Sequence, residues 1–159
     1  METVLILDFG AQYSQLIARR VREQNVYCEV KPCSISPDEI RKLAPIGIIL
    51  SGGPQSVYES VSLHVDPALF SLGIPVLGIC YGCQLMAYSL GGTVAAATEA
   101  TAREYGKTLT EFDTESAIFH GLPSSSVTWM SHGDYISQVP DGFTVTAKTA
   151  GCPTAAMAC

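Results

Sequence analysis

Residues 75–87, PVLGICYGCQLMA, decide how this chain folds. A short apolar run leads into Cys80, a glycine stands two positions to either side of it, and a helix-forming run follows. This pattern predicts a buried strand, a sharp turn with the cysteine at its tip, and a helix that leaves the turn. It is the cysteine version of a nucleophile elbow. The flanking glycines, Gly78 and Gly82, allow helix and strand to pack closely around a strained turn.

The place of Cys80 at the start of a helix predicts a nucleophilic thiolate. Free N–H groups and the partial positive charge of a helix N-terminus lower a thiol pKa and can hold an oxyanion. Two other interpretations stay open. Free cysteine is often simply buried, and Cys80 with Cys83 spells the C-x-x-C pattern of a thiol redox module.

The composition predicts one globular, cytoplasmic domain over residues 1–159. The chain is 47% hydrophobic and 15% charged, which suits a packed core. Its net charge of -6 and the absence of a basic tract make nucleic acid an unfavourable partner. No apolar run has membrane-spanning length, and the N-terminus lacks the basic start of a signal peptide. Without an export signal, most of the six cysteines are expected to be reduced, structural thiols.

Apolar runs alternate with helical patterns through the first half of the sequence. Strands are expected at 4–7, 27–30, 47–50 and in the elbow. Between them, Ser14 is expected to cap a helix that runs to about residue 24, residues 36–39 are expected to start a second helix with a capping box, and Asp66 is expected to open a short third helix. This order predicts an α/β fold, a three-layer open, mainly parallel sheet with helices on both faces. Sites in such sheets lie beyond the carboxyl ends of the strands, where residues 10–13, residues 51–54 and Cys80 all fall.

After the glycine pair at 91–92, which is expected to end the elbow helix, the pattern changes. Segments 107–112, 126–130 and 143–147 alternate like half-exposed strands and predict antiparallel additions to the core. Residues 103–106 are expected to form a solvated turn. No linker or repeat is visible, so a single domain is the simplest organisation.

Two further segments are candidates for a site. Residues 51–54, SGGP, would expose backbone N–H groups after a strand and could hold an oxyanion, although an ordinary turn explains them equally well. Residues 131–134, SHGD, invite a base at His132 oriented by Asp134. A structural role for His132 is favoured, since this spacing does not ensure that either side chain reaches Cys80. The three histidines stand apart from paired cysteines, so no metal site is predicted.

Gly78, Cys80, Gly82 and Gln84 together resemble the catalytic cysteine motif of class I, triad-type glutamine amidotransferases. The resemblance narrows to the amidotransferase domain of the GMP synthase family. It rests on blocks that cover the whole chain in order: ILDFGAQY at 6–13, SGGPQSVYE at 51–59, REYG at 103–106, WMSHGD at 129–134 and CPTAAM at 152–157. It implies the flavodoxin-like fold of that family and a ligase of purine biosynthesis.

The resemblance also implies roles for particular residues. Cys80 attacks the side-chain amide of L-glutamine, forms a γ-glutamyl thioester and releases ammonia. The backbone N–H groups of Gly53 and Tyr81 form the oxyanion hole. Gln84 and the SHGD segment, Ser131, His132, Gly133 and Asp134, hold the glutamine backbone groups, so His132 is not the base.

The chain departs from the family in two respects. The triad needs a His-x-Glu motif, and none occurs in these 159 residues. We therefore expect a C-terminally truncated piece without its last strands and with little turnover of its own. By resemblance, the parent is a homodimer that amidates XMP with ATP and Mg in another domain, and this domain needs no cofactor. Cys83 stands where the family usually has methionine. A non-catalytic scaffold domain and the Cys80–Cys83 redox module remain the alternatives.

Overall fold

A computed structural model of the chain describes residues 2–97 and 103–159. The chain divides into two compact units, Met1–Met86 and Ala87–Cys159, which are described one at a time. The expectation that all 159 residues form one domain stays a prediction.

The first unit is built on a parallel sheet with the strand order β2-β1-β3-β4. Its strands are β1 (Thr3–Asp8), β2 (Tyr27–Pro32), β3 (Gly47–Leu50) and β4 (Val76–Gly78). Apolar residues on both faces of β1 are fully buried, which is why this strand reads as a continuous apolar run. The four predicted strands and their parallel pairing are confirmed.

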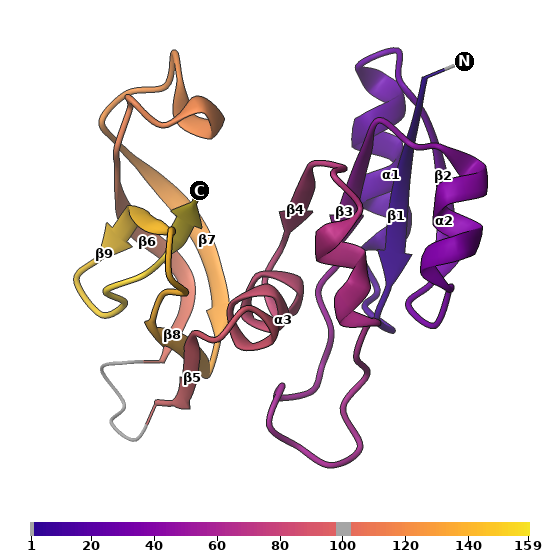
Figure 1. Cartoon of the computed structure of the whole chain (residues 1–159). Helices are drawn as coiled ribbons and strands as arrows, with labels where there is room; N and C mark the ends of the chain where they lie inside the picture. Colours follow the sequence, from indigo (N-terminus) through magenta and orange to yellow (C-terminus); the bar gives the residue numbers. More distant parts are fainter. Residues whose placement is uncertain (1, 98–102) are drawn as a thin grey trace. The chain divides into compact units, whose positions relative to one another are not determined.

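Helices α1 (Ser14–Glu23) and α2 (Pro37–Leu43) lie on opposite faces of this sheet (Figure 1). Ala18 of α1 packs in a cluster with Ile6 and Cys28 of the sheet. The predicted capping box is confirmed, because the Ser36 side chain accepts from the Glu39 backbone and the Glu39 side chain from Ser36. The prediction that Ser14 caps α1 is wrong, since its hydroxyl donates instead to the Asp8 carboxylate, at 2.7 Å.

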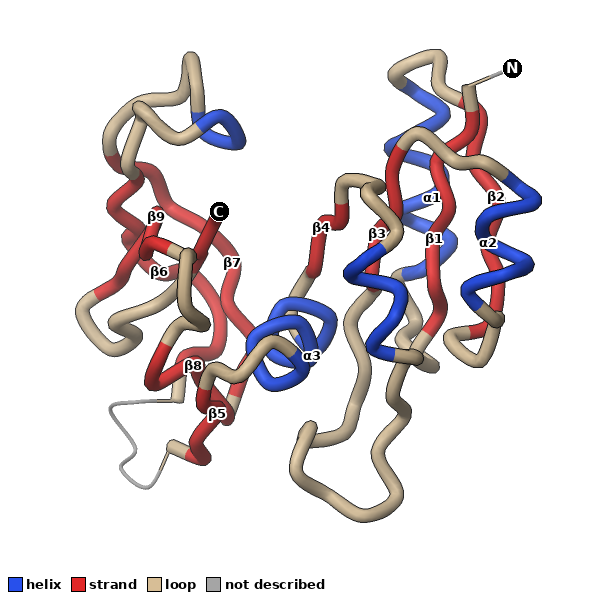
Figure 2. Tube along the Cα trace, viewed as in Figure 1, coloured by secondary structure: helices blue, strands red, loops and turns tan. Residues whose placement is uncertain are grey.

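Two further helical segments lead to and from the elbow. The predicted short helix after Asp66 is the 3-10 helix η1 (Pro67–Ser71), and the elbow helix is α3 (Tyr81–Ser89). The chain between β3 and η1 is a long loop without helix or strand (Figure 2). The positive φ of Gly91 follows the end of α3, as the glycine pair predicts.

The second unit consists of antiparallel strands, as predicted for the chain after Gly92. One sheet has the order β10-β9-β6-β7, and β5 pairs with β8 in a separate ladder. The strands are β5 (Thr93–Ala96), β6 (Glu104–Phe112), β7 (Ser125–His132), β8 (Asp134–Gln138), β9 (Thr144–Thr149) and β10 (Ala156–Ala158), with the 3-10 helix η2 (Ala117–Phe119) before β7.

The sheet of β6 and β7 turns a threonine-rich face inward and an apolar face outward. Thr110 is buried and shares a 2.6 Å hydrogen bond with Thr128 on the neighbouring strand. On the other face, Leu109 and Val127 pair across the strands and are each 61% exposed, and Trp129 is 74% exposed. The solvated turn expected at 103–106 is wrong, because β6 begins at Glu104, whose side chain is buried.

Candidate functional site

The elbow predicted around Cys80 is present in the first unit. Strand β4 ends at Gly78, helix α3 begins at Tyr81, and Cys80 lies between them with a φ of 51°. This left-handed backbone is uncommon for a residue with a side chain and carries strain. The nucleophile at such an elbow has the same combination of strained turn and helix start.

The glycines beside Cys80 are required by close backbone packing. A Cβ on Gly78 would lie 2.6 Å from the Cys83 backbone nitrogen and equally close to the Gly82 carbonyl group. A Cβ on Gly82 would collide with the backbone and Cβ of Leu50 in β3. The first turn of α3 therefore lies directly on β3 and β4, as the glycine spacing predicts.

Backbone hydrogen bonds fasten this turn to the end of β3. Ile79 N–H donates to the Leu50 carbonyl at 3.0 Å, and Gly82 N–H donates to the Ser51 carbonyl at 3.1 Å. Cys83 and Gln84 both donate their N–H groups to the Cys80 carbonyl, at 3.0 and 3.1 Å. These hydrogen bonds hold the backbone of Cys80 in place between the end of β4 and the start of α3.

The glycine-rich loop after β3 lies beside the elbow. A Cβ on Gly53 would stand 3.4 Å from Cγ of Tyr81, and one on Gly52 would stand 3.6 Å from Cβ of Cys80. Tyr81 opens α3, and the first N–H groups of a helix have no acceptor within the helix. The two residues predicted to form an oxyanion hole, Gly53 and Tyr81, are therefore neighbours.

The side chain of Tyr81 secures its own backbone. The ring packs on Phe9 with a centroid separation of 5.4 Å, and the hydroxyl donates to the Leu63 carbonyl. Desolvation raises the pKa of this phenol, so the hydroxyl stays a donor. Phe9 follows β1 and Leu63 lies in the loop before η1, so Tyr81 joins three separate segments at the carboxyl edge of the sheet.

The turn after β1 completes this edge. Oδ1 of Asp8 accepts from Gly10 N–H at 2.9 Å and from the Ser14 hydroxyl, which fixes the turn as an Asx-type motif. The Ser51 hydroxyl, fully buried, accepts from Phe9 N–H at 3.2 Å. The carboxyl ends of β1, β3 and β4 are therefore linked. The three segments expected at this edge, residues 10–13, residues 51–54 and Cys80, lie together there.

The Cys80 thiol itself differs from the prediction. The residue is exposed, yet the chain around it removes enough water from the sulfur to raise its pKa above that of an ordinary cysteine. The prediction of a lowered pKa at Cys80 is wrong, because desolvation by burial raises this pKa. Cys80 therefore needs a base to become a nucleophile at neutral pH. No disulfide joins Cys80 and Cys83.

The SHGD segment lies in the second unit. Ser131 and His132 end β7, Asp134 begins β8, and Gly133 is the residue at which the chain leaves one ladder for the other. The Gly133 carbonyl accepts from Ala97 N–H at 2.9 Å. The segment is thus a fixed junction and not a surface loop.

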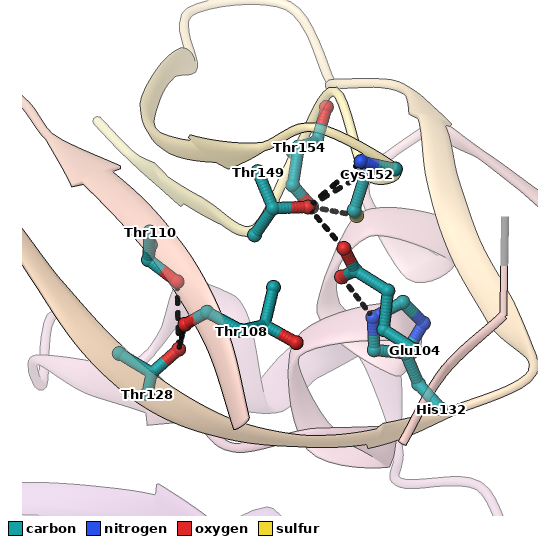
Figure 3. Close-up of polar contacts among 9 residues, drawn as sticks. Glu104, Thr108, Thr110, Thr128, His132, Thr149, Cys152 and Thr154 are labelled. Atoms are coloured by element: carbon teal, nitrogen blue, oxygen red, sulfur yellow. Dashed lines mark hydrogen bonds and ion pairs between the residues drawn. The ribbon is translucent and has the colours of Figure 1, made fainter. Parts of the chain in front are cut away.

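Beneath this junction lies a polar network that sequence reasoning missed (Figure 3). Glu104 and His132 are partners across β6 and β7, and Oε2 of Glu104 lies 3.1 Å from Nε2 of His132. Oε1 of Glu104 accepts from the Thr149 hydroxyl. Glu104, Thr108 and Thr110 occupy alternate positions of β6 on its less exposed face, and their polar character gave no signal of that burial.

The same network is the place where the described residues could hold a metal ion. One ligand atom each from Glu104, His132 and Cys152 lies within 4.8 Å of the others. The carboxylate is already engaged by His132 and Thr149, and the Cys152 thiol donates to the Thr154 carbonyl at 3.3 Å. Burial raises the pKa of Cys152, which favours the thiol over the thiolate that a metal binds. These contacts favour a hydrogen-bond network.

Comparison with known proteins places these features in a family. The family model described as glutamine amidotransferase class-I matches residues 5–159. Among curated proteins, the chain is 56% identical over 158 residues to a GMP synthase [glutamine-hydrolyzing] of Clostridium botulinum, covering 99% of the chain and 30% of that protein. It is 56% identical over 157 residues to the protein of that name from Thermobifida fusca, covering 98% of the chain and 29% of that protein.

Solved structures agree on the fold. A GMP synthase subunit from Thermoplasma acidophilum superposes with a TM-score of 0.86 at 30% identity, covering 99% of the chain and 78% of that protein. A glutamine amidotransferase of Thermotoga maritima superposes with a TM-score of 0.76 at 20% identity, covering 99% and 71%, which supports the fold alone.

The chain belongs to the class I glutamine amidotransferase family, and it has the mixed α/β, flavodoxin-like fold with a parallel sheet that the sequence predicts. It spans about three tenths of the length of the curated relatives that it matches, which are GMP synthases. Among the described residues, no helix has the length and apolar character needed to cross a membrane.

Proposed function

We propose that this chain is the glutamine-hydrolysing part of a GMP synthase, with Cys80 as its nucleophile. The observation that carries the proposal is the strained backbone of Cys80 at the start of α3, with Gly53 beside Tyr81. The names and identities of the curated relatives support the assignment to glutamine hydrolysis within GMP synthesis.

The chemistry follows from the elbow. The Cys80 thiolate attacks the side-chain amide carbon of glutamine, and the carbonyl oxygen becomes an oxyanion that the N–H groups of Gly53 and Tyr81 stabilise. Collapse of this intermediate breaks the C–N bond, and the nitrogen leaves as ammonia once it takes up a proton. Water then cleaves the γ-glutamyl thioester to glutamate and restores the thiol.

The remaining contacts of the substrate are also proposals. Gln84 and the SHGD segment, residues 131–134, would hold the α-amino and α-carboxylate groups of glutamine. Since desolvation raises the pKa of Cys80, a base has to take its proton before attack. The absence of His-x-Glu from residues 1–159 supports the expectation that this chain alone turns over glutamine slowly.

The wider reaction is proposed from the resemblance to the GMP synthase family. In the complete enzyme, the ammonia would amidate XMP that ATP and Mg have activated, and the working assembly would be a cytoplasmic homodimer. We assign these features to the remainder of such an enzyme, since the chain covers only 30% of the relative from Clostridium botulinum.

The test is covalent labelling of the elbow by a diazoketone analogue of glutamine, followed by mass spectrometry. We expect one adduct on Cys80, slowed by free L-glutamine, and no adduct in Cys80→Ser. The Cys83→Ser variant should label like the unmodified chain. Labelling that glutamine does not slow would refute the proposal, and a Cys80–Cys83 disulfide with exchange activity would support the redox alternative.

A further inference from the structure

The start of β6 places a carboxylate below the segment proposed to bind glutamine. Glu104 is directly opposite His132 in the β6–β7 ladder, and their side chains are only 8% and 15% exposed. A carboxylate so far from water is costly unless it is paired. The 3.1 Å contact with Nε2 of His132 provides that pairing from the end of β7.

The contact is also the ring's one polar anchor within the described residues. Nδ1 of His132 is buried and has no hydrogen-bond partner in residues 2–97 and 103–159. Nε2 meets only Glu104 within the same part of the chain. Among the described residues, hydrogen bonding therefore orients this ring through Glu104 alone.

The Glu104 carboxylate has a second partner, Thr149, as Figure 3 shows. The Thr149 hydroxyl donates to Oε1 of Glu104 and accepts N–H groups from Gly151 and Cys152, at 3.2 and 2.9 Å. The turn that follows β9 thus connects through Thr149 and Glu104 to His132. Both carboxylate oxygens of Glu104 therefore have partners, one in β7 and one at the end of β9.

The segment above needs such an anchor because ladder pairing ends there. Ser131 and His132 pair with β6, whereas Asp134 pairs with Ala96 of β5 in another ladder. Between them, Gly133 has its carbonyl bonded to Ala97 N–H. The orientation of the backbone groups of residues 131–134 therefore depends on how Glu104 holds His132.

We propose that Glu104 is a positioning residue for glutamine binding, which holds the backbone of residues 131–134 in its binding geometry through the His132 ring. The inference rests on the proposed function, since it assumes that this segment binds glutamine. Glu104 does not touch the substrate. Its effect is on the affinity for glutamine and on the order of the segment, and not on the reactivity of Cys80.

The experiment uses the whole chain with the variants Glu104→Ala and Glu104→Gln. The Glu104→Gln side chain keeps the length and one acceptor oxygen of Glu104, so it should restore part of what Glu104→Ala loses. Glu111→Ala is the matched control, because Glu111 lies on the same strand and pairs with Lys148 at the surface. Thr149→Val leaves Glu104 in place and removes the hydroxyl that bonds Oε1 of Glu104 and the N–H groups of Gly151 and Cys152; it serves if Glu104→Ala does not fold.

Three quantities are measured: L-glutamine affinity by calorimetry, alkylation of Cys80 by iodoacetamide, and amide hydrogen exchange of residues 131–134 without ligand. Glu104→Ala should weaken glutamine binding by about ten- to a hundredfold, as expected when a buried charged contact is lost. Exchange in the segment should become faster, and Cys80 alkylation should not change. Thr149→Val should shift affinity and exchange in the same direction by less.

The outcomes distinguish the positioning role of Glu104 from the proposed function of the chain. If Glu104→Ala matches Glu111→Ala in its affinity for L-glutamine and in the amide hydrogen exchange of residues 131–134, the positioning role is overturned and the proposed function stands. An unmodified chain that does not bind glutamine would overturn the proposed function, while the exchange measurement would still decide whether Glu104 orders the segment. A Cys80 alkylation rate that changes as much as the affinity does in Glu104→Ala would mean a disturbance of the whole fold and would also overturn the positioning role.

Discussion

Gly78→Ala tests whether the elbow is as tightly packed as its backbone contacts indicate. The added methyl group would lie 2.6 Å from three backbone atoms, one in Cys83 and two in Gly82. Backbone cannot rotate away as a flexible side chain can, so α3 must move off β4. Overpacking of this kind costs about 1–3 kcal/mol, and the fixed neighbours favour the upper part, about 2–3 kcal/mol, of that range.

Gly47→Ala is the matched control in the same sheet. There the new methyl group would meet only the Pro75 carbonyl, at 3.8 Å, an ordinary contact, and the φ of Gly47 is not positive. Restricting the unfolded chain should then stabilise this variant by about 0.5 kcal/mol. The two substitutions add the same atoms, so the difference between them reports the packing at the elbow.

The assay is urea unfolding followed by far-ultraviolet circular dichroism. With a slope of about 2 kcal/mol/M, the Gly78→Ala midpoint should fall by about 1 M or more, and the Gly47→Ala midpoint should rise slightly. A Gly78→Ala midpoint equal to that of the unmodified chain would refute the close approach of α3 to β4. So would a Gly47→Ala chain that is the less stable of the two.

Three more predictions concern single contacts. Desolvation raises the pKa of Cys80, and only the thiolate reacts with iodoacetamide. The rate of Cys80 alkylation should therefore still rise at pH values where the rate for a short cysteine peptide has become constant. A rate profile shifted to lower pH would contradict this. Tyr81→Phe removes the hydroxyl that meets the Leu63 carbonyl and should cost about 1–2 kcal/mol in urea unfolding, whereas Tyr13→Phe, at an exposed position, should cost nothing measurable. Ser36→Ala should lose about 1 kcal/mol with the capping box of α2, against no loss in Ser34→Ala, and equal midpoints for the two would argue against the cap.

The parts of the fold that the sequence predicts are those fixed by local signals. The run at residues 4–7 is apolar at every position because β1 is buried on both faces, and the capping box at Ser36 needs only residues three apart. The elbow belongs to this group as well. Gly78 and Gly82 are glycines because neighbouring backbone occupies the space of a side chain.

The parts that were missed depend on partners far away in the sequence. Glu104 and His132 are 28 residues apart, and only the register of β6 and β7 brings them together. Alternation in β6 does not reveal its inner face, because Thr110 is buried and Leu109 is exposed, the reverse of what hydrophobicity suggests. The raised pKa of Cys80 likewise arises from how many segments surround the sulfur, which no motif encodes.

The outward position of Trp129 has a practical consequence for spectroscopy. It is the chain's single tryptophan, and it stands 74% exposed on β7 in the second unit. Its indole should already emit at the long wavelengths of a water-exposed fluorophore, so unfolding of the elbow unit would hardly change the spectrum. Iodide should quench it readily in the native state. A blue shift with protection from iodide would instead signal that another surface covers Leu109, Val127 and Trp129, which makes this indole a built-in optical reporter for that side of the sheet.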